Sequence, residues 1–312
     1  MSSFPIEKKL VIAVSSSALF DLSESHAIFE EHGPKAYKIF QEKNLDKVLA
    51  KGVAFPFIKR FLNINQHYKA EEPVEVVLLS RNSAATGKRV FRSIEHYGLK
   101  ISRAAFMEGK SPFEYVPAFN ASLFLSANEE DVKKAIQAGY PAGVVLPGKV
   151  VNDDGDEELR IAFDFDGVIA DDEAESVYKS GNLNDFTAHE VEKSHIPHQP
   201  GPLADLFRKL SFMQALEDDK VEQDHDYKRL IRTAIITARS APTHERVITT
   251  LEEWGVSANE TIFLGGMEKE RILTRLKPHM FFDDQRGHLK SDAGDIPMVH
   301  IPFGIANVGI ST

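Results

Sequence analysis

Short apolar segments alternate with longer amphipathic ones along nearly the whole chain, and this alternation constrains the fold more than any other feature. We predict two series of strands, the first at 9–14, 74–79, 101–107, 122–125 and 143–146, and the second at 160–165, 233–236, 261–264, 280–282 and 298–301. Helices are predicted at 24–44, 55–67, 86–97, 129–138, 244–254 and 268–276. Strands that alternate with helices favour a parallel sheet covered on both faces. The expected fold class is therefore α/β, with two doubly wound, Rossmann-like parallel sheets.

A polar, acidic and turn-rich stretch from Pro147 to Glu158 separates the two series. A chain of 312 residues is long for one core and comfortable for two. We therefore predict an N-terminal domain at 1–150 and a C-terminal domain at 151–312. The acids of this stretch are interpreted as a solvated linker rather than a calcium loop, because the ligand spacing and flanking helices of an EF-hand are missing.

The composition argues against several classes of function. There are no cysteines, which excludes disulfides, thiolate nucleophiles and cysteine-bound metal centres. The formal charge of −10 argues against a nucleic-acid partner and against an anionic membrane surface. The apolar run at 10–14 is shorter than the core of a signal peptide, and no stretch approaches the ~20 apolar residues of a spanning helix. These features favour a cytoplasmic protein that has neither a nucleic acid nor a membrane as its partner.

Two aspartates, Asp164 and Asp166, follow the apolar strand that begins at Arg160. Alternate residues of a strand face the same side, so we expect both carboxylates to leave the strand end together. Gly167 then allows a sharp turn of the backbone. This arrangement suits a divalent cation held beside a nucleophile. The alternative is an ordinary strand end with two solvated acids.

Three further pieces are predicted to meet these aspartates at the carboxyl edge of the sheet. Thr237 ends the next strand, Lys269 starts a helix after two glycines, and another strand ends in Asp283 and Asp284. Ligands bind at this edge in open α/β folds. Each piece alone has an ordinary explanation as a helix cap, an exposed lysine or an acidic loop. Their joint occurrence in this order predicts a phosphoryl-transfer site.

The two halves of the chain also align with each other. The segment at 13–20 matches 162–169 at an offset of 149 residues, and the segment at 78–83 matches 235–240 at an offset of 157. The alternative is that any two doubly wound domains share such spacing. Duplication is favoured because the acids are confined to the second half: the positions of Asp164, Asp166, Asp283 and Asp284 are held in the first by Ser15, Ser17, Ser126 and Ala127. We therefore predict a catalytically empty N-terminal domain.

The order of the motifs resembles the haloacid dehalogenase (HAD) superfamily of phosphohydrolases. Over nearly the full chain, the sequence also resembles the cytosolic 5′-nucleotidase type I family. This resemblance lies in Ala13-Val-Ser-Ser-Ser-Ala-Leu-Phe-Asp21, Ala54-Phe-Pro-Phe57, His96-Tyr-Gly-Leu99, Gly109-Lys-Ser-Pro112, Thr237-Ala-Arg-Ser240 and Lys277-Pro-His-Met-Phe-Phe-Asp-Asp-Gln285. The chain departs from the animal members in one motif, which reads Phe-Asp-Phe-Asp-Gly here and Phe-Asp-Gly-Asp there. The two aspartates keep their spacing.

The resemblance implies a role for each motif. Asp164 would be the nucleophile that forms an aspartyl-phosphate. Asp166 would protonate the leaving oxygen and then deprotonate the attacking water. Thr237, the amide of Ala238 and the ammonium of Lys269 would bind the transferring phosphoryl oxygens.

The resemblance also implies a Mg²⁺ cofactor. Its ligands would be Asp164, the carbonyl of Asp166, and either Asp283 or Asp284, because Mg²⁺ prefers oxygen ligands. Strand parity does not decide between the last two. Hydrolysis of phosphate monoesters is among the slowest uncatalysed reactions, so a metal and a fixed cation are expected partners of the nucleophile.

About 70 residues separate the first two motifs, and we expect them to form a helical cap at about 171–230. Phe186, His189 and Glu190 are weak candidates for contacting the nucleoside, and a role in the cap core or surface is the alternative. We interpret His195 and His198, in a proline-rich stretch, as incidental residues of a hinge loop rather than metal ligands, because no third ligand is near.

Two arginines near the second motif have two possible roles. Arg239 and Arg246 either reach the phosphate or pair at the surface with Glu245 or Glu252. The sequence does not decide between these roles.

These observations lead to the hypothesis of a Mg²⁺-dependent 5′-nucleotidase that hydrolyses nucleoside 5′-monophosphates, with AMP favoured by the resemblance. The alternatives are a phosphatase for another small phosphomonoester and a nucleotide-binding sensor with little turnover. The resemblance also suggests a regulatory nucleotide bound by the N-terminal domain, and a homo-oligomer is a further possibility.

Overall fold

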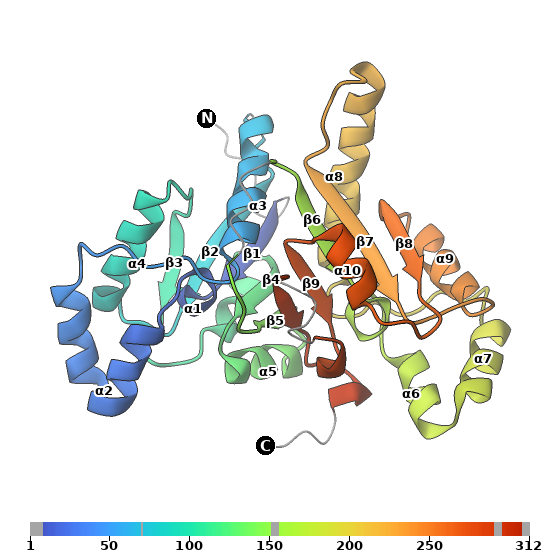
Figure 1. The fold of residues 1–312 in the computed structure, drawn as a ribbon, viewed down its shortest axis with the longest axis horizontal. Helices are drawn as coiled ribbons and strands as arrows, with labels where there is room; N and C mark the ends of the chain where they lie inside the picture. Colours follow the sequence, from blue (N-terminus) through green and yellow to red (C-terminus); the bar gives the residue numbers. More distant parts are fainter. Residues whose placement is uncertain (1–8, 70, 151–155, 290–294, 308–312) are drawn as a thin grey trace. The chain divides into compact units, whose positions relative to one another are not determined.

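The computed structural model (Figure 1) describes residues 9–69, 71–150, 156–289 and 295–307, apart from the side chain of residue 219. The chain divides into two compact units, Met1–Asp153 and Asp154–Thr312. Each unit contains parallel strands joined through helices, so the expected α/β class is confirmed. Residues 151–155, which fall in the predicted linker, lie outside the described residues.

The first unit is built on strands in the order β3-β2-β1-β4-β5. Their bounds are β1 Leu10–Val14, β2 Val74–Ser80, β3 Arg103–Phe106, β4 Ala121–Ser126 and β5 Ala142–Val145. All five residues of β1 are buried, as its apolar sequence predicts for a central strand of a parallel sheet. The helices are α1 Ser16–Leu19, α2 Ser23–Lys43, α3 Phe55–His67, α4 Ala84–His96 and α5 Glu129–Gln137, with short turns η2 Phe113–Tyr115 and η3 Pro117–Phe119.

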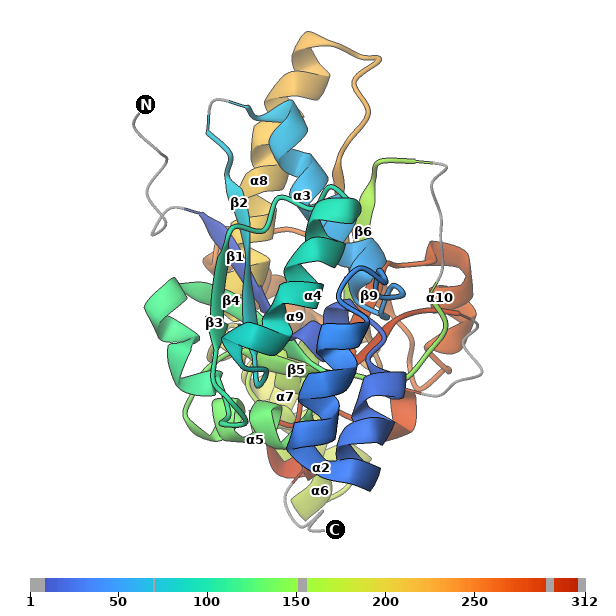
Figure 2. The same ribbon diagram turned by 90° about the vertical axis from the view of Figure 1, so that its left-hand side faces the viewer.

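Helix α2 is bent, and it packs beside α4 (Figure 2). The bend falls at Gly33, whose φ of 76° is open to glycine at little cost, and Pro34 follows it. Helix α4 begins with a capping box in which Ser83 and Thr86 satisfy each other's backbone amides. These local signals explain why the predicted helix bounds agree with the observed ones.

The second unit has strands in the order β10-β9-β6-β7-β8. Their bounds are β6 Leu159–Phe163, β7 Ile231–Thr237, β8 Glu260–Phe263, β9 Met280–Asp283 and β10 Met298–His300. The remaining elements are η4 Phe165–Ile169, α6 Glu173–Ser180, α7 Leu183–Glu192, α8 Ala204–Gln223, α9 His244–Glu253, α10 Glu270–Leu276, η5 Arg286–His288 and η6 Ile305–Asn307. In its core the ring of Phe163 stacks on Phe282, with 5.2 Å between centroids.

The three helices of the predicted cap segment fall into two groups. Helices α6 and α7 pack against each other as a hairpin (Figure 1), and α6 also contacts η4, the turn after β6. Helix α8 instead covers the sheet, where Phe207 meets the ring of Phe163 edge-on at 5.6 Å. Among the described residues, no helix is long and apolar enough to cross a membrane.

The second unit repeats the strand order of the first. When β6–β10 are matched in turn with β1–β5, the first unit read from β3 and the second read from β8 both give the order third, second, first, fourth, fifth. Equivalent hydrogen bonds recur at the strand ends. The amide of Ser15 donates to the carbonyl of Leu125 over 2.8 Å, and the amide of Asp164 donates to the carbonyl of Phe282 over 2.8 Å.

The turn after the first strand differs by one residue between the units. In the first unit, the amide of Phe20 closes the turn on Ser16 over 2.9 Å, whereas in the second the amide of Ala170 closes it on Phe165 over 2.9 Å. Phe20 therefore corresponds to Ala170, one residue further along than the sequence alignment places it. The extra residue lies in the turn that carries Asp166.

Candidate active site

The two aspartates of the first motif lie just past the end of β6. The strand ends at Phe163, so the prediction that it extends to residue 165 was wrong. Asp164 keeps an extended backbone, with φ −70° and ψ 162°, and Asp166 lies within the turn η4. The backbone then reverses at Gly167, whose φ is +71°. The turn, rather than strand alternation, sets the direction of Asp166.

Lys269 connects two of the predicted acids. It precedes α10, and its Nζ lies 2.7 Å from Oδ2 of Asp164 and 2.7 Å from Oδ2 of Asp283. All three side chains are buried. The residue predicted to bind phosphoryl oxygens therefore also holds the predicted nucleophile in place.

Burial and neighbouring charge shift the pKa values of these acids in opposite directions. Burial raises the pKa of Asp164 to about 7, against the opposing charge of Lys269. Burial acts on Asp283 in the same sense, but Lys269 and His288 outweigh it and hold the pKa of Asp283 below its ordinary value. Without a further cation, Asp283 is therefore ionised more readily than Asp164.

Asp284 is the acid that lacks a partner. Its Oδ1 is buried and has no hydrogen-bond partner among the described residues. Burial, reinforced by the charges of Asp164 and Asp283, raises the pKa of Asp284 to about 9. A bound cation would offset the cost of charge on such a buried carboxylate, and the oxygen without a hydrogen bond could serve as its ligand.

Asp283, by contrast, already has its partners. Its oxygens accept hydrogen bonds from Lys269 at 2.7 Å and from the amide of Gln285 at 2.8 Å, and Nδ1 of His288 lies 3.2 Å away. Asp164, Asp283 and His288 also form a group whose ligand atoms lie within 4.8 Å of one another. Because Asp283 is already bound to Lys269, a cation would bind more readily to Oδ1 of Asp284 than to the oxygens of Asp283.

The second motif supplies Thr237 and Ala238 at the end of β7. Thr237 is buried, and its Oγ1 accepts a 3.3 Å hydrogen bond from the amide of Arg239, while Ala238 is exposed. The carbonyls of Thr237 and Ala238 hold the backbone after β8 through the amides of Leu264 and Gly266, at 2.9 and 3.1 Å. This pairing brings the segment that leads to Lys269 toward the second motif.

Arg239 is buried, and its contact with Asp166 was not predicted from the sequence. Its Nε and Nη2 donate to the two carboxylate oxygens of Asp166, over 2.8 and 2.6 Å. Burial opposes charge on Asp166, but Arg239 outweighs it and holds the pKa of Asp166 below its ordinary value. Of the two roles left open for Arg239, surface pairing with Glu245 or Glu252 is therefore excluded.

Helix α7 contributes a fully buried carboxylate to the same cluster. Glu190 pairs with Arg239 on one oxygen and with Nη1 of Arg246 on the other, the latter over 2.8 Å. Nη2 of Arg246 also forms an ion pair with Oε2 of Glu173 in α6, over 2.7 Å. Arg246 is thus buried, which excludes the surface-pairing alternative for this residue as well.

His198 belongs to this cluster, and its interpretation as an incidental residue was wrong. It is 1% exposed, with Nε2 3.0 Å from Nη2 of Arg239 and Nδ1 3.3 Å from Oδ1 of Asp171. His198, Asp171 and Glu173 form a second group with ligand-like spacing. Glu173 is already paired with Arg246 and with Lys193 at 2.5 Å, so we interpret the group as a hydrogen-bonded network.

The remaining sequence candidates lie on or near α7. Phe186 is half-buried, with its ring centre 5.5 Å from Cζ of Arg239. His189 is half-buried too, with Nδ1 2.9 Å from Glu190. His195 is exposed. Phe186 and His189 therefore lie beside the cluster formed by Asp166, Arg239 and Glu190.

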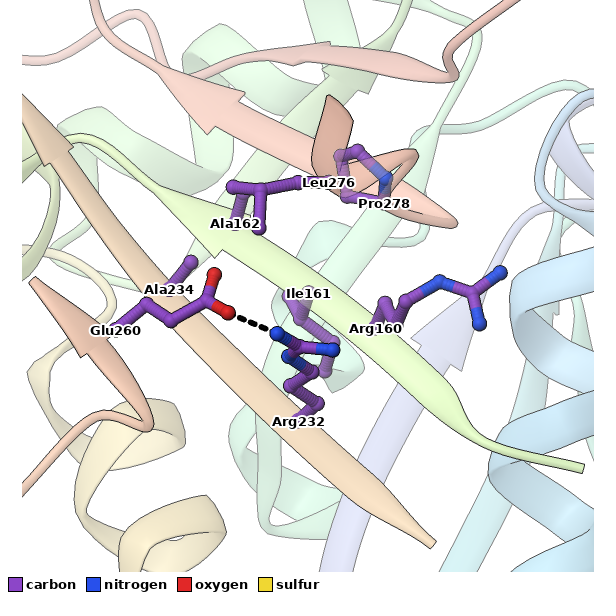
Figure 3. Close-up of a pocket in the computed structure, with 8 residues that line it drawn as sticks. All are labelled: Arg160, Ile161, Ala162, Arg232, Ala234, Glu260, Leu276 and Pro278. Carbon is purple, nitrogen blue, oxygen red and sulfur yellow. Dashed lines mark hydrogen bonds and ion pairs between the residues drawn. The ribbon is translucent and has the colours of Figure 1, made fainter. Parts of the chain in front are cut away.

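A pocket lies at the opposite ends of the strands (Figure 3). It is lined by Arg160, Ile161, Ala162, Arg232, Ala234, Glu260, Leu276 and Pro278, with Arg232 paired to Glu260. Arg160 and Arg232 are the second residues of β6 and β7, and Glu260 is the first residue of β8. This pocket is therefore at the amino ends of the strands, away from the aspartates.

Taken together, buried acids, a lysine and a threonine at the carboxyl edge of a parallel sheet define an α/β protein whose candidate site lies where open α/β folds bind ligands. A family model for 5′-nucleotidases matches residues 2–308. The chain belongs to the 5′-nucleotidase family. It is 35% identical over 290 residues to human "Cytosolic 5'-nucleotidase 1B", covering 90% of this chain and 47% of that protein. The chain thus spans about half the length of this relative, and no solved structure matches it.

Proposed function

We propose that the chain is a Mg²⁺-dependent 5′-nucleotidase of the HAD type, with its active site in the second unit. The observation that carries this proposal is the group formed by Asp164, Lys269 and Asp284, in which a held nucleophile lies near an acid without a partner. Membership of the 5′-nucleotidase family supports the nucleoside 5′-monophosphate as substrate. AMP is the substrate we favour.

The proposed reaction proceeds in two displacements. An oxygen of Asp164 attacks phosphorus, the bond to the 5′-oxygen of the ribose breaks, and that oxygen takes the proton of Asp166, which enters this step in its minor, protonated form. Asp166 then takes a proton from water, the hydroxyl oxygen attacks phosphorus, and the bond to Asp164 breaks. The products are a nucleoside and inorganic phosphate, with both aspartates restored.

The groups around phosphorus offset the charge of the transferring phosphoryl group. Lys269 already reaches Asp164, so its ammonium would lie beside the new bond. Thr237 and the amide of Ala238, at the end of β7, are proposed to donate to the equatorial oxygens. Removal of one such donor from other enzymes lowers the rate by about 10²–10³-fold.

The residues present fit a divalent cation. Asp164, the carbonyl of Asp166 and Asp284 would hold Mg²⁺, and the partnerless Oδ1 of Asp284 supports the choice of Asp284 over Asp283. When bound, the ion would neutralise charge on the phosphoryl oxygens and on the buried carboxylates.

Helices α6 and α7 are proposed as the cap over this site. Glu190 and Glu173 anchor them through ion pairs to Arg239 and Arg246 of the sheet domain, the first buried and the second partly buried. Phe186, beside Arg239, offers an aromatic face to the base of the nucleotide, and His189 lies one turn from it. The cap proposed here omits α8, which covers the sheet.

The first unit is proposed to be a duplicated and catalytically empty copy. The shared strand order and the repeated hydrogen bonds at Ser15 and Asp164 support duplication. Its residues at the four acid positions carry no charge. A regulatory nucleotide in this unit, a homo-oligomer and a cytoplasmic location belong to the same proposal, and the last accords with the word cytosolic in the relative's name.

A substrate panel tests the proposed function. Phosphate release from AMP, IMP, CMP, UMP and glucose 6-phosphate is measured at equal concentration. The proposal predicts release from nucleotides with a preference among bases and little from the sugar phosphate. Equal release from glucose 6-phosphate would favour the general phosphatase, and tight nucleotide binding without release would favour the sensor.

A further inference from the structure

The carboxylate of Asp166, the predicted acid and base, is bound by two hydrogen bonds from a single arginine. The guanidinium of Arg239 covers both of its carboxylate oxygens, at 2.8 and 2.6 Å. Arg239 is itself 4% exposed. A planar fork of this kind fixes both the charge and the orientation of a carboxylate.

Arg239 is in turn fixed by residues from outside the sheet. Glu190 of α7 pairs with its Nη1, and His198, on the loop after α7, lies 3.0 Å from its Nη2. Glu190 is 0% exposed and His198 is 1% exposed. The helical hairpin therefore reaches Asp166 through a chain of buried contacts.

In the second unit Arg246 contacts the carbonyl of Ile196 and the side chain of Glu190, and we call this set of contacts the arginine frame. The first unit contains a matching frame around Arg89. Nε of Arg246 donates to the carbonyl of Ile196 over 2.9 Å, and Nε of Arg89 donates to the carbonyl of Lys47 over 2.8 Å. Nη1 of each arginine also donates to a buried residue two helices earlier in the chain, on α7 for Arg246 and on α2 for Arg89. This residue is Glu190 for Arg246, over 2.8 Å, and Gln41 for Arg89, over 3.3 Å.

A second pair of bonds confirms that the two frames correspond. The amide of His198 donates to Oγ1 of Thr250 over 3.0 Å, and the amide of Leu49 donates to Oγ of Ser93 over 3.0 Å. Each bond ties the loop after the helical segment to the helix that carries the frame arginine. The packing of this helical segment against the body is thus common to both units.

The residues that differ between the two units are Asp166 itself and the residues that contact it directly or through Arg239. Arg246 is retained as Arg89, whereas the set Asp166, Arg239, Glu190 and His198 is replaced in the first unit by Ser17, Asn82, Gln41 and Leu49. A contact needed only for packing would persist in both units, as that of Arg246 does. The replaced set changes together with the nucleophile and the metal-binding acids.

We propose that Arg239 is a positioning residue that orients the carboxylate of Asp166 for proton removal from water, and that Glu190 holds Arg239 in that position. The inference rests on the proposed function, because it assigns Asp166 the role of base in the second displacement. Arg246, by contrast, fastens the helical hairpin to the body. Arg239 acts through Asp166 and is assigned no contact with the phosphoryl group or with the attacking water.

The test separates the two displacements with p-nitrophenyl phosphate, whose leaving group departs without an acid. Nitrophenolate release follows formation of the aspartyl-phosphate, and steady turnover then follows its hydrolysis. Arg239→Asn, which installs the residue of the first unit, is expected to keep a burst near one nitrophenolate per active site. Its steady rate should fall about 10²-fold, the scale of a single base.

The control variant is Arg232→Asn, which removes an arginine at the amino end of β7, the strand that precedes Arg239. Arg232 pairs with Glu260 in the pocket of Figure 3 and is half exposed. Its burst and steady rate should match those of the natural chain. Glu190→Gln should lower the steady rate in the same direction as Arg239→Asn, and the two changes combined should lower it no further than Arg239→Asn alone.

Two outcomes for Arg239→Asn would overturn the inference. A parallel loss of burst and steady rate would show a merely structural role, and unchanged kinetics would show no role. Failure of the proposed function has a different signature, namely a natural chain that hydrolyses neither p-nitrophenyl phosphate nor AMP. Arg239→Lys, which keeps the charge but loses the fork, should give a steady rate between those of the natural chain and Arg239→Asn.

Discussion

Gly167 and Asp284 approach so closely that a Cβ atom on Gly167 would lie 2.6 Å from Oδ2 of Asp284. Gly167 also has a φ of +71°, which costs other residues about 1–2 kcal/mol. Gly167→Ala should therefore displace the carboxylate best placed to hold the metal. We expect a loss of thermal stability and a weaker response of that stability to Mg²⁺.

The matched control for this change is Gly148→Ala. Gly148 is exposed, its φ is not positive, and nothing lies within 4 Å of a Cβ placed there. Its melting temperature and Mg²⁺ response should be those of the natural chain. If Gly167→Ala behaved like this control, the close packing of the turn against Asp284 would have no part in the metal site.

Asp284→Asn tests the assignment of the metal without relying on activity. In the natural chain Mg²⁺ should raise the melting temperature, because it binds the folded state and neutralises buried carboxylates. The variant removes the charge that Mg²⁺ would meet, so most of this rise should disappear. A full rise in the variant would show that the cation is held elsewhere.

Lys269→Met removes the cation between Asp164 and Asp283. Loss of one partner from a buried ion pair typically costs about 3–5 kcal/mol. We expect a fall of this size in the free energy of unfolding without Mg²⁺, measured by urea titration, and a partial recovery when Mg²⁺ is added. Turnover should fall at least about 10²-fold. Unchanged stability would mean that the two carboxylates are not charged together.

His198 predicts a pH dependence of stability. Burial disfavours its charged form, but hydrogen bonds to Asp171 and Glu190 outweigh this and raise the pKa of His198. A raised pKa in the folded state gives a stability contribution that is complete below the ordinary value of about 6.5 and is lost as the pH rises through the folded-state pKa. Melting temperatures from about pH 6 to about pH 9 should therefore fall more steeply for the natural chain than for His198→Gln. Equal slopes would contradict this.

Ser15→Ala tests the empty character of the first unit. Oγ of Ser15 caps α1 by accepting from the amide of Ala18 over 3.1 Å, so its loss should lower the free energy of unfolding by about 1 kcal/mol. The turnover of AMP should stay unchanged, because the proposal gives the serine that matches Asp164 no chemical role. A large fall in turnover with little change in stability would place part of the active site in the first unit.

Much of the fold could be predicted because its signals are local. Apolar strands such as β2 and capped helices such as α4 carry their boundaries in adjacent residues. The aspartates could be named because strand ends of a parallel sheet share one edge. Asp283 and Asp284 could not be separated in this way, since the choice depends on Lys269 and His288 reaching one of them.

The network around Arg239 could not be predicted because its partners come from distant segments. Glu190 lies in a helix of mixed polarity, where a charged residue usually faces solvent. Only the fold brings it to Arg239, 49 residues further along the chain. The comparison of Glu190 with Gln41, and of Arg239 with Asn82, was available in the sequence once the two halves were aligned.

The most direct test of the central claim is AMP hydrolysis by the natural chain and by Asp164→Asn, with Mg²⁺ or with EDTA. The account predicts phosphate release by the natural chain that needs Mg²⁺, and none above background by Asp164→Asn, whose melting temperature should show that it is folded. Release that persists in folded Asp164→Asn would contradict the assignment of the nucleophile and place the reaction outside the site described.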